Sequence, residues 1–182
     1  SSTIMFFNDA TNNTITNCTI LGSSTGAVTD NTGTILFSTG TGNGNDGNNI
    51  SNNFISPAGA NLPTKAIMAL GSTSSNAIRN SGNTIDNNKI YDFFDAGGSV
   101  SGIYIYNGND SWTISNNRIY QTAPRSFGNP AGSRYAGITL NTVTRPGAFT
   151  VSNNIIGFGA ANGTGTTTIS GSTAQGLQNE FR

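Results

Sequence analysis

The sequence predicts an all-β solenoid, in which each stacked coil adds one short strand to each of three parallel sheets. The first observation is a motif, I/V-x-N-N-x-I, that recurs along the chain. A motif with this spacing is typical of stacked structural repeats. The second observation is a set of short, alternating apolar runs bounded by Gly, Asn and Ser, which is the signature of strands. The third is that no stretch keeps the apolar spacing of a helix.

The first strand of each coil is expected in a short run rich in Ile and aromatic residues. These runs lie at residues 3–7, 34–38, 66–70, 102–106 and 137–141. Side chains alternate between the two faces of a strand. We therefore expect Phe6, Phe37, Ile105 and Leu140 to point into the core.

The second and third strands come from the two halves of the repeated motif. The second is centred on Ile15, Ile50, Ile85, Ile114 and Val151, and the third holds Ile20, Ile55, Ile90, Ile119 and Ile156. Trp112 and Phe149 precede an inward Ile or Val by two positions. We interpret both as core residues rather than ligand platforms.

An Asn pair separates the second strand from the third and predicts a sharp corner between two sheets. Asn tolerates left-handed backbone angles and can hydrogen-bond its own turn. Stacking would place the second Asn of each pair in one column, with the amides bonded along the stack. This ladder is expected to comprise Asn53, Asn88, Asn117 and Asn154. Cys18 takes the first position of the column, where we expect a small buried thiol.

The whole chain is expected to form a single β-helix segment over residues 1–182. Its coils lie at about 3–21, 34–56, 66–91, 102–120 and 137–157, and a tail follows at 158–182. The connecting loops vary in length and character, as insertions in solenoids do. Neither end shows a capping pattern, which solenoids need. We therefore expect the segment to belong to a longer protein, with further β-helix coils as its neighbours.

The composition excludes several classes of function. Eight basic and eight acidic residues give a neutral chain, without the basic surface of a nucleic-acid binder. No apolar run approaches the ~20 residues of a membrane helix, so membrane insertion is not expected. The single cysteine excludes an internal disulfide, and the absence of His removes the commonest general base. Nothing predicts a metal or another cofactor.

The segment GIYIYNGNDSWTISNNRIYQT resembles the right-handed parallel β-helix repeat of the pectate-lyase-like superfamily. The resemblance extends over all five coils and implies that fold. It does not choose a function, because the superfamily includes lyases, hydrolases, phage tailspikes and adhesins. The loop sequences IYDFFDAGG and IYQTAPRSF resemble those of large secreted proteins of Bacteroidota, exported by the type IX secretion system. That likeness implies a secreted, extracellular protein attached to the cell surface.

Few residues are candidates for catalysis. β-Helix enzymes use paired carboxylates or Asp-bound calcium, and the outward positions of the first strands hold no carboxylate. Asp86 and Lys89 are separated by the Asn corner and are expected to form a solvated pair. Asp92 and Asp95, which flank two Phe residues, are the best acid pair available. The alternative is that each of them caps a turn.

The outer face of the first sheet is the candidate binding surface. It comprises the outward residues Met5, Phe7, Leu36, Met68, Leu70, Tyr104 and Tyr106. A continuous exposed apolar stripe normally marks an interaction surface. Aromatic rings beside Asn and Ser would also suit carbohydrate. The alternative, which the sequence leaves open, is that a variable loop folds over this stripe and buries it.

Three functions are compatible with these features. We favour a structural or adhesive segment of a bacterial surface protein, whose partner is a polysaccharide or another surface or secretion-system protein. A polysaccharide lyase or glycoside hydrolase module is the alternative. Ice binding on a flat face is disfavoured, because the outward columns are not regular Thr arrays and the coils vary in length.

Overall fold

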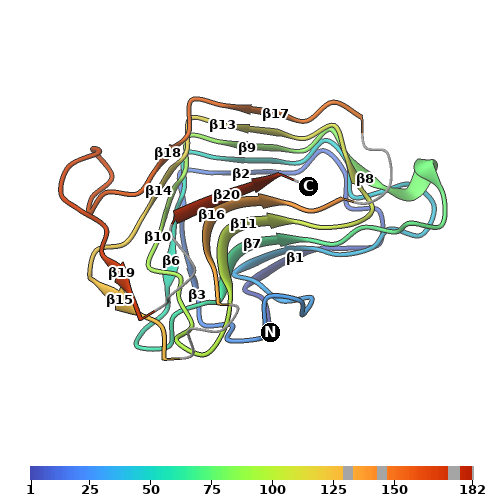
Figure 1. Cartoon of the computed structure of the whole chain (residues 1–182). Helices are drawn as coiled ribbons and strands as arrows, with labels where there is room; N and C mark the ends of the chain where they lie inside the picture. The colour runs from blue at the N-terminus through green and yellow to red at the C-terminus, as the bar shows by residue number, and fades with distance from the viewer. Residues whose placement is uncertain (129–132, 143–146, 172–176, 182) are drawn as a thin grey trace.

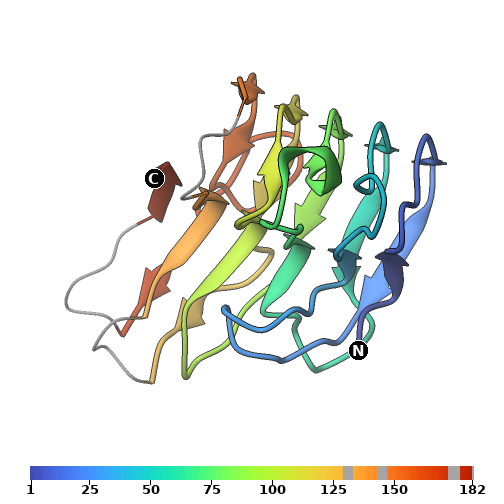
Figure 2. The same ribbon diagram turned by 90° about the vertical axis from the view of Figure 1, so that its right-hand side faces the viewer.

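The computed structural model confirms a parallel β-solenoid with three main sheets. It describes residues 1–128, 133–142, 147–171 and 177–181. The coils surround a common interior in Figure 1, and Figure 2 shows them stacked side by side from the N-terminus to the C-terminus. Every strand pairing in the three sheets is parallel, and equivalent residues of successive coils lie opposite one another.

The first sheet has six strands and the largest share of buried residues. Its strands, in order, are β1 (Ile4–Phe6), β4 (Ile35–Phe37), β7 (Lys65–Ala69), β11 (Val100–Ile105), β16 (Tyr135–Leu140) and β20 (Leu177–Phe181). The last strand falls in the region that the sequence suggested to be a tail. Part of that region therefore continues the first sheet beyond the fifth coil.

The second and third sheets have five strands each and meet at the Asn corner. The second comprises β2 (Thr14–Thr16), β5 (Asn49–Ser51), β9 (Thr84–Asp86), β13 (Thr113–Ser115) and β17 (Thr150–Ser152). The third comprises β3 (Thr19–Gly22), β6 (Phe54–Pro57), β10 (Lys89–Tyr91), β14 (Arg118–Tyr120) and β18 (Ile155–Ile156). These bounds match the expected coils closely.

Short elements lie in the connections between the sheets. Two small pairs are β8 (Asn80–Ser81) with β12 (Asn109–Asp110), and β15 (Arg125–Ser126) with β19 (Ile169–Ser170). A single 3-10 turn, η1 (Asn76–Ile78), is the helical element of the described residues. In this part of the chain, no helix has the length and apolar character to span a membrane.

The interior is a stack of apolar rungs, as the repeated motif predicts. Ile50, Ile85 and Ile114 of the second sheet are fully buried, as are Ile55, Ile90 and Ile119 of the third. The rings of Phe6 and Phe37 stack at 4.4 Å between centroids, and Trp112 meets Phe37 edge-on at 4.8 Å. Trp112 is fully buried and Phe149 packs against the same core, so the prediction of core residues is confirmed.

The prediction that Cys18 is buried is wrong. Its thiol is free and exposed. The residue lies in the first coil of the structure, and its Sγ donates to the Thr16 carbonyl oxygen at 3.2 Å.

Candidate binding surface

The corner between the second and third sheets is built by the Asn pair of each coil. The Asn that begins each corner adopts a left-handed backbone, with φ between 51° and 58°: Asn17, which precedes Cys18, and Asn52, Asn87, Asn116 and Asn153, which each precede a second Asn. Asn reaches this region more readily than most residues because its short polar side chain bonds locally. The second Asn then turns its amide into the corner.

These inward amides form a hydrogen-bonded ladder along the stack. The Asn88 Oδ1 accepts from the main-chain N and the Nδ2 of Asn53, at 3.0 and 3.1 Å. The Asn88 Nδ2 donates to the Ile50 carbonyl at 2.8 Å and to the Asn117 Oδ1 at 3.1 Å. Asn117 repeats the pattern and donates to the Asn154 Oδ1 at 2.9 Å. Each interior amide therefore uses both its oxygen and its nitrogen, as a buried polar group must.

Two further Asn ladders lie near the start of the second sheet. One joins Asn13, Asn48 and Asn83, and the other joins Asn45, Asn80 and Asn109. Members of the first ladder are 35 and 35 residues apart, and members of the second are 35 and 29 residues apart, as are the motif Ile residues of the same coils. The sequence analysis did not identify them, although this shared spacing was the signal for both.

The outer face of the first sheet is covered rather than exposed over its central part. Leu36, Met68 and Tyr104 are 5%, 0% and 8% exposed, and Val28 of the preceding loop packs against them. These three residues therefore do not form a free binding surface, and the alternative of a covering loop holds. We call residues 23–33 the strap.

A buried lysine lies beneath the same strap. The Lys65 Nζ donates to the carbonyl oxygen of Ala27, and the side chain is fully buried. Burial lowers the pKa of Lys65 from 10.5 to about 8, although the negative charge of Asp30 raises it. The strap thus covers a cation as well as an apolar stripe.

The remaining residues of the expected stripe lie at its margins. Met5 and Phe7 of the first coil are 50% and 56% exposed, whereas Leu70 and Tyr106 are half-buried. Met5 and Phe7 line a shallow hollow with Asn8, Ser38, Thr39 and Thr41. This is the part of the expected surface that solvent reaches.

The candidate acid pair does not converge on a shared site. The Asp92 carboxylate accepts from the main-chain N and the hydroxyl of Thr122, at 2.8 and 2.6 Å, and from Arg125 at 2.7 Å. The Asp95 Oδ1 accepts from the Gly97 N–H at 2.8 Å and so closes its own turn. The turn-capping alternative thus describes Asp95, whereas Asp92 joins two coils.

Asp86 and Lys89 also have separate partners. Asp86 Oδ1 accepts from the Ser115 hydroxyl at 2.6 Å and from the Asn116 amide at 2.8 Å. The Lys89 Nζ lies 4.3 Å from the centre of the Phe54 ring. The expected solvated pair is therefore replaced by a contact between coils and a cation–π contact.

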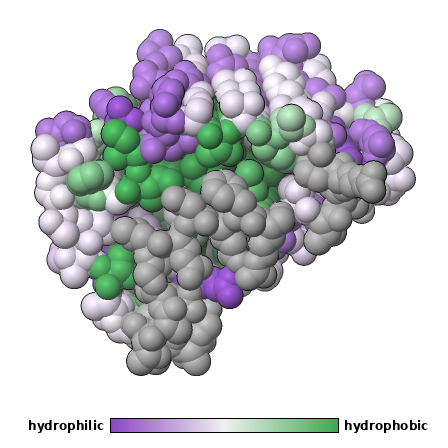
Figure 3. Space-filling view, turned by 45° about the horizontal axis from the view of Figure 1, so that its top comes forward, coloured by the Kyte–Doolittle hydropathy of each residue, from purple (hydrophilic) through white to green (hydrophobic). Residues whose placement is uncertain are grey.

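The polar outer surfaces differ between the second and third sheets. Over the second sheet the surface in Figure 3 is mostly purple and white, which reflects its Thr, Ser and Asn residues. The third sheet presents Thr19, Phe54, Lys89, Arg118 and Ile155 in one row, each beside the next. A hollow of about 310 Å³ lies where this row meets the Asn corner.

Comparison of the chain with family models, curated proteins and solved structures finds no match. The fold defines the protein as a parallel β-solenoid. Among the residues that the structure describes, no three His, Cys, Asp or Glu side chains cluster as metal ligands would.

Proposed function

We propose that the chain is a structural or adhesive β-helix segment of a secreted bacterial cell-surface protein. The observation that carries this proposal is the use of its carboxylates. Asp9, Asp46, Asp86, Asp92 and Asp110 each accept hydrogen bonds from a residue in the following coil. Asp30 and Asp95, the other acids whose side chains the structure describes, each accept from a main-chain N–H of their own loop. The carboxylates that a glycosidase would use for catalysis instead form hydrogen bonds that hold coils and loops together.

Asp9 shows this use most fully. Its carboxylate accepts from the main-chain N–H groups of Thr41, Gly42 and Asn43, at 2.8, 2.9 and 3.1 Å. These bonds lower the pKa of Asp9, with those from Gly42 and Thr41 contributing most. The lowered pKa keeps this carboxylate ionised, so it can accept the hydrogen bonds that join two coils. An ionised carboxylate has no proton to donate in catalysis.

The secreted and surface-attached character rests on the resemblance of the loops to large Bacteroidota proteins exported by the type IX secretion system. In this proposal the coils form a rigid spacer, and exposed loops and sheet faces contact a polysaccharide or another surface protein. Antibody labelling of intact cells that produce the parent protein tests the location. Labelling only after lysis would contradict it.

The competing enzyme hypothesis is tested with a panel of pectins, alginates and other polysaccharides, with and without calcium. We expect neither new reducing ends nor unsaturated products. Turnover that is abolished by Asp92→Asn or Asp95→Asn would overturn the structural proposal. It would favour a lyase or glycoside hydrolase of the pectate-lyase-like superfamily.

A further inference from the structure

The third sheet brings two cations together on its outer face. Lys89 of β10 and Arg118 of β14 are direct partners in the parallel register. Neighbouring strands are about 4.8 Å apart, and like charges directly opposite one another destabilise a sheet. Both side chains are partly exposed to solvent. An unfavourable pair of this kind would be relieved by an anion bound across it.

The protein itself does not supply that anion among its described residues. Arg125 and Arg79 form salt bridges with Asp92 and Asp110, at 2.7 and 3.8 Å. Lys89 and Arg118 form none in the described part of the chain; Arg118 has only a long contact, 3.5 Å, with the Asn116 carbonyl. These two cations remain available to a ligand.

The carboxylates nearest in sequence are engaged elsewhere. Asp86 is bound by Ser115 and Asn116 on the second sheet, and Asp92 is bound by Thr122 and Arg125. The hydroxyl of Tyr120, farther along β14, is neutral at physiological pH, as tyrosine hydroxyls ordinarily are, and burial raises its pKa further, to about 12. It adds no negative charge to this face.

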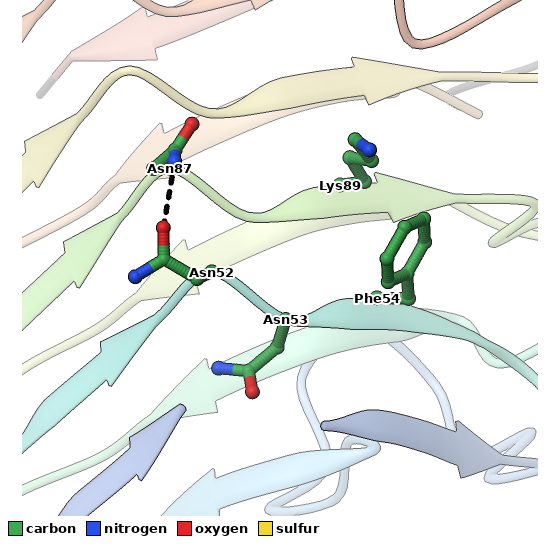
Figure 4. A pocket seen from close by; sticks show the side chains of 5 residues that line it. All are labelled: Asn52, Asn53, Phe54, Asn87 and Lys89. Carbon is green, nitrogen blue, oxygen red and sulfur yellow. Dashed lines mark hydrogen bonds between the residues drawn. The ribbon is translucent and has the colours of Figure 1, made fainter. Parts of the chain in front are cut away.

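Groups that suit a sugar ring lie beside Lys89. The Phe54 ring is 41% exposed and lies beneath the Lys89 ammonium group (Figure 4). The amides of Asn52 and Asn87 border the same hollow and are joined by a hydrogen bond of 2.7 Å. Aromatic faces stack on the apolar faces of sugars, and amides bond their hydroxyl groups.

We propose that this face of the third sheet binds an anionic polysaccharide. Phe54 contacts a sugar ring, Lys89 and Arg118 pair with its sulfate or carboxylate groups, and Asn52 and Asn87 bond its hydroxyls. The row crosses successive coils, so a linear polymer can lie along it. This inference rests on the adhesive role proposed above and assigns it a ligand class and a site. No bond is made or broken.

The test compares polymers that share one backbone. We expect dextran sulfate or carboxymethyl dextran to bind the protein in low salt at least about tenfold more tightly than neutral dextran, measured by calorimetry. Added salt should weaken the binding, because exposed charges are screened. The tighter of the two charged polymers identifies the preferred anionic group. Equal binding of all three would overturn the proposal.

Variants locate the site. The double variant Lys89→Gln/Arg118→Gln should bind about tenfold more weakly, and Phe54→Ala should lower affinity several-fold. The control is Arg134→Gln, because Arg134 lies outside this face; it should change the affinity less than about twofold. Unfolding midpoints should confirm that each variant is folded. Wild-type affinity in the double variant, or an equal loss in Arg134→Gln, would overturn this site. Neither result would affect the cell-surface labelling or the turnover test of the general proposal.

Discussion

The Asn corner and the strap both protect buried polar or apolar groups, but they are built in opposite ways. At the corner, the Asn residues of successive coils repeat one set of hydrogen bonds. At the first sheet, Val28 of the strap packs against the apolar stripe, and the Ala27 carbonyl of the same loop accepts from Lys65. The corner is thus a cooperative feature of the repeat, whereas the strap belongs to one loop.

This difference determines how far a substitution affects the stability of the neighbouring coils. Removing one rung of the corner leaves unpaired groups in both neighbouring coils. Loosening the strap exposes groups on the outside and leaves the rungs in place. We therefore expect the largest losses of stability at the corner.

The sharpest test is Asn117→Ala. It removes an acceptor for the Asn88 main-chain and side-chain N–H groups and the donor to the Ile85 carbonyl and the Asn154 Oδ1. Buried groups left without partners cost about 1–3 kcal/mol, and several are orphaned here. We expect a loss of about 3 kcal/mol in the free energy of unfolding, measured with denaturant.

Thr113→Ala is the matched control in the same coil. Thr113 lies on β13, facing outward and half-buried, and should tolerate the change within about 0.5 kcal/mol. If Asn117→Ala unfolds at the midpoint of the control, the ladder contributes nothing to stability.

The strap predicts a rise of stability in mild alkali. Folded Lys65 loses its proton near pH 8, whereas in the unfolded chain it keeps the proton to about 10.5. Between these values the unfolded state binds more protons, so stability increases as the pH rises. The charged ammonium group keeps its hydrogen bond to the Ala27 carbonyl, so we expect a gain of only about 1 kcal/mol.

The measurement compares the wild type with Lys65→Met at pH 7.5 and pH 10. The difference between the two proteins isolates this lysine from other titrating groups. If the two proteins respond equally to pH, Lys65 is not buried in its charged form, and the strap does not cover it.

The sequence was sufficient to predict the core and ladder positions that recur in every coil. It was not sufficient to predict the path of a loop that occurs once. Ile85, Ile114 and Asn117 could be placed because each has counterparts at the same position of other coils. The cover of Met68 by Val28 depends on the path of one irregular loop, for which the chain holds no second copy. Cys18 was misplaced because a repeat pattern describes interior rungs, and this residue lies in the first one. The register of Lys89 with Arg118 and their lack of a carboxylate partner among the described residues emerged only from the structure.

Cys18→Asn is expected to change the stability least of the test substitutions discussed, and it tests whether the Asn ladder can be extended into the first coil. The Asn53 Oδ1 now accepts one hydrogen bond from the first coil, from the Cys18 main-chain N–H at 2.9 Å. In every later pair, the Asn Nδ2 adds a second bond to the next Oδ1. The substitution should supply that bond and raise the free energy of unfolding. Because the position is exposed, the gain should be only about 0.5 kcal/mol.

Cys18→Ser is the control, since it also removes the thiol but offers no amide. A stabilised Asn variant beside an unchanged Ser variant would show that the ladder acts even at an exposed rung. Equal stabilities would restrict its contribution to rungs that are buried on both sides.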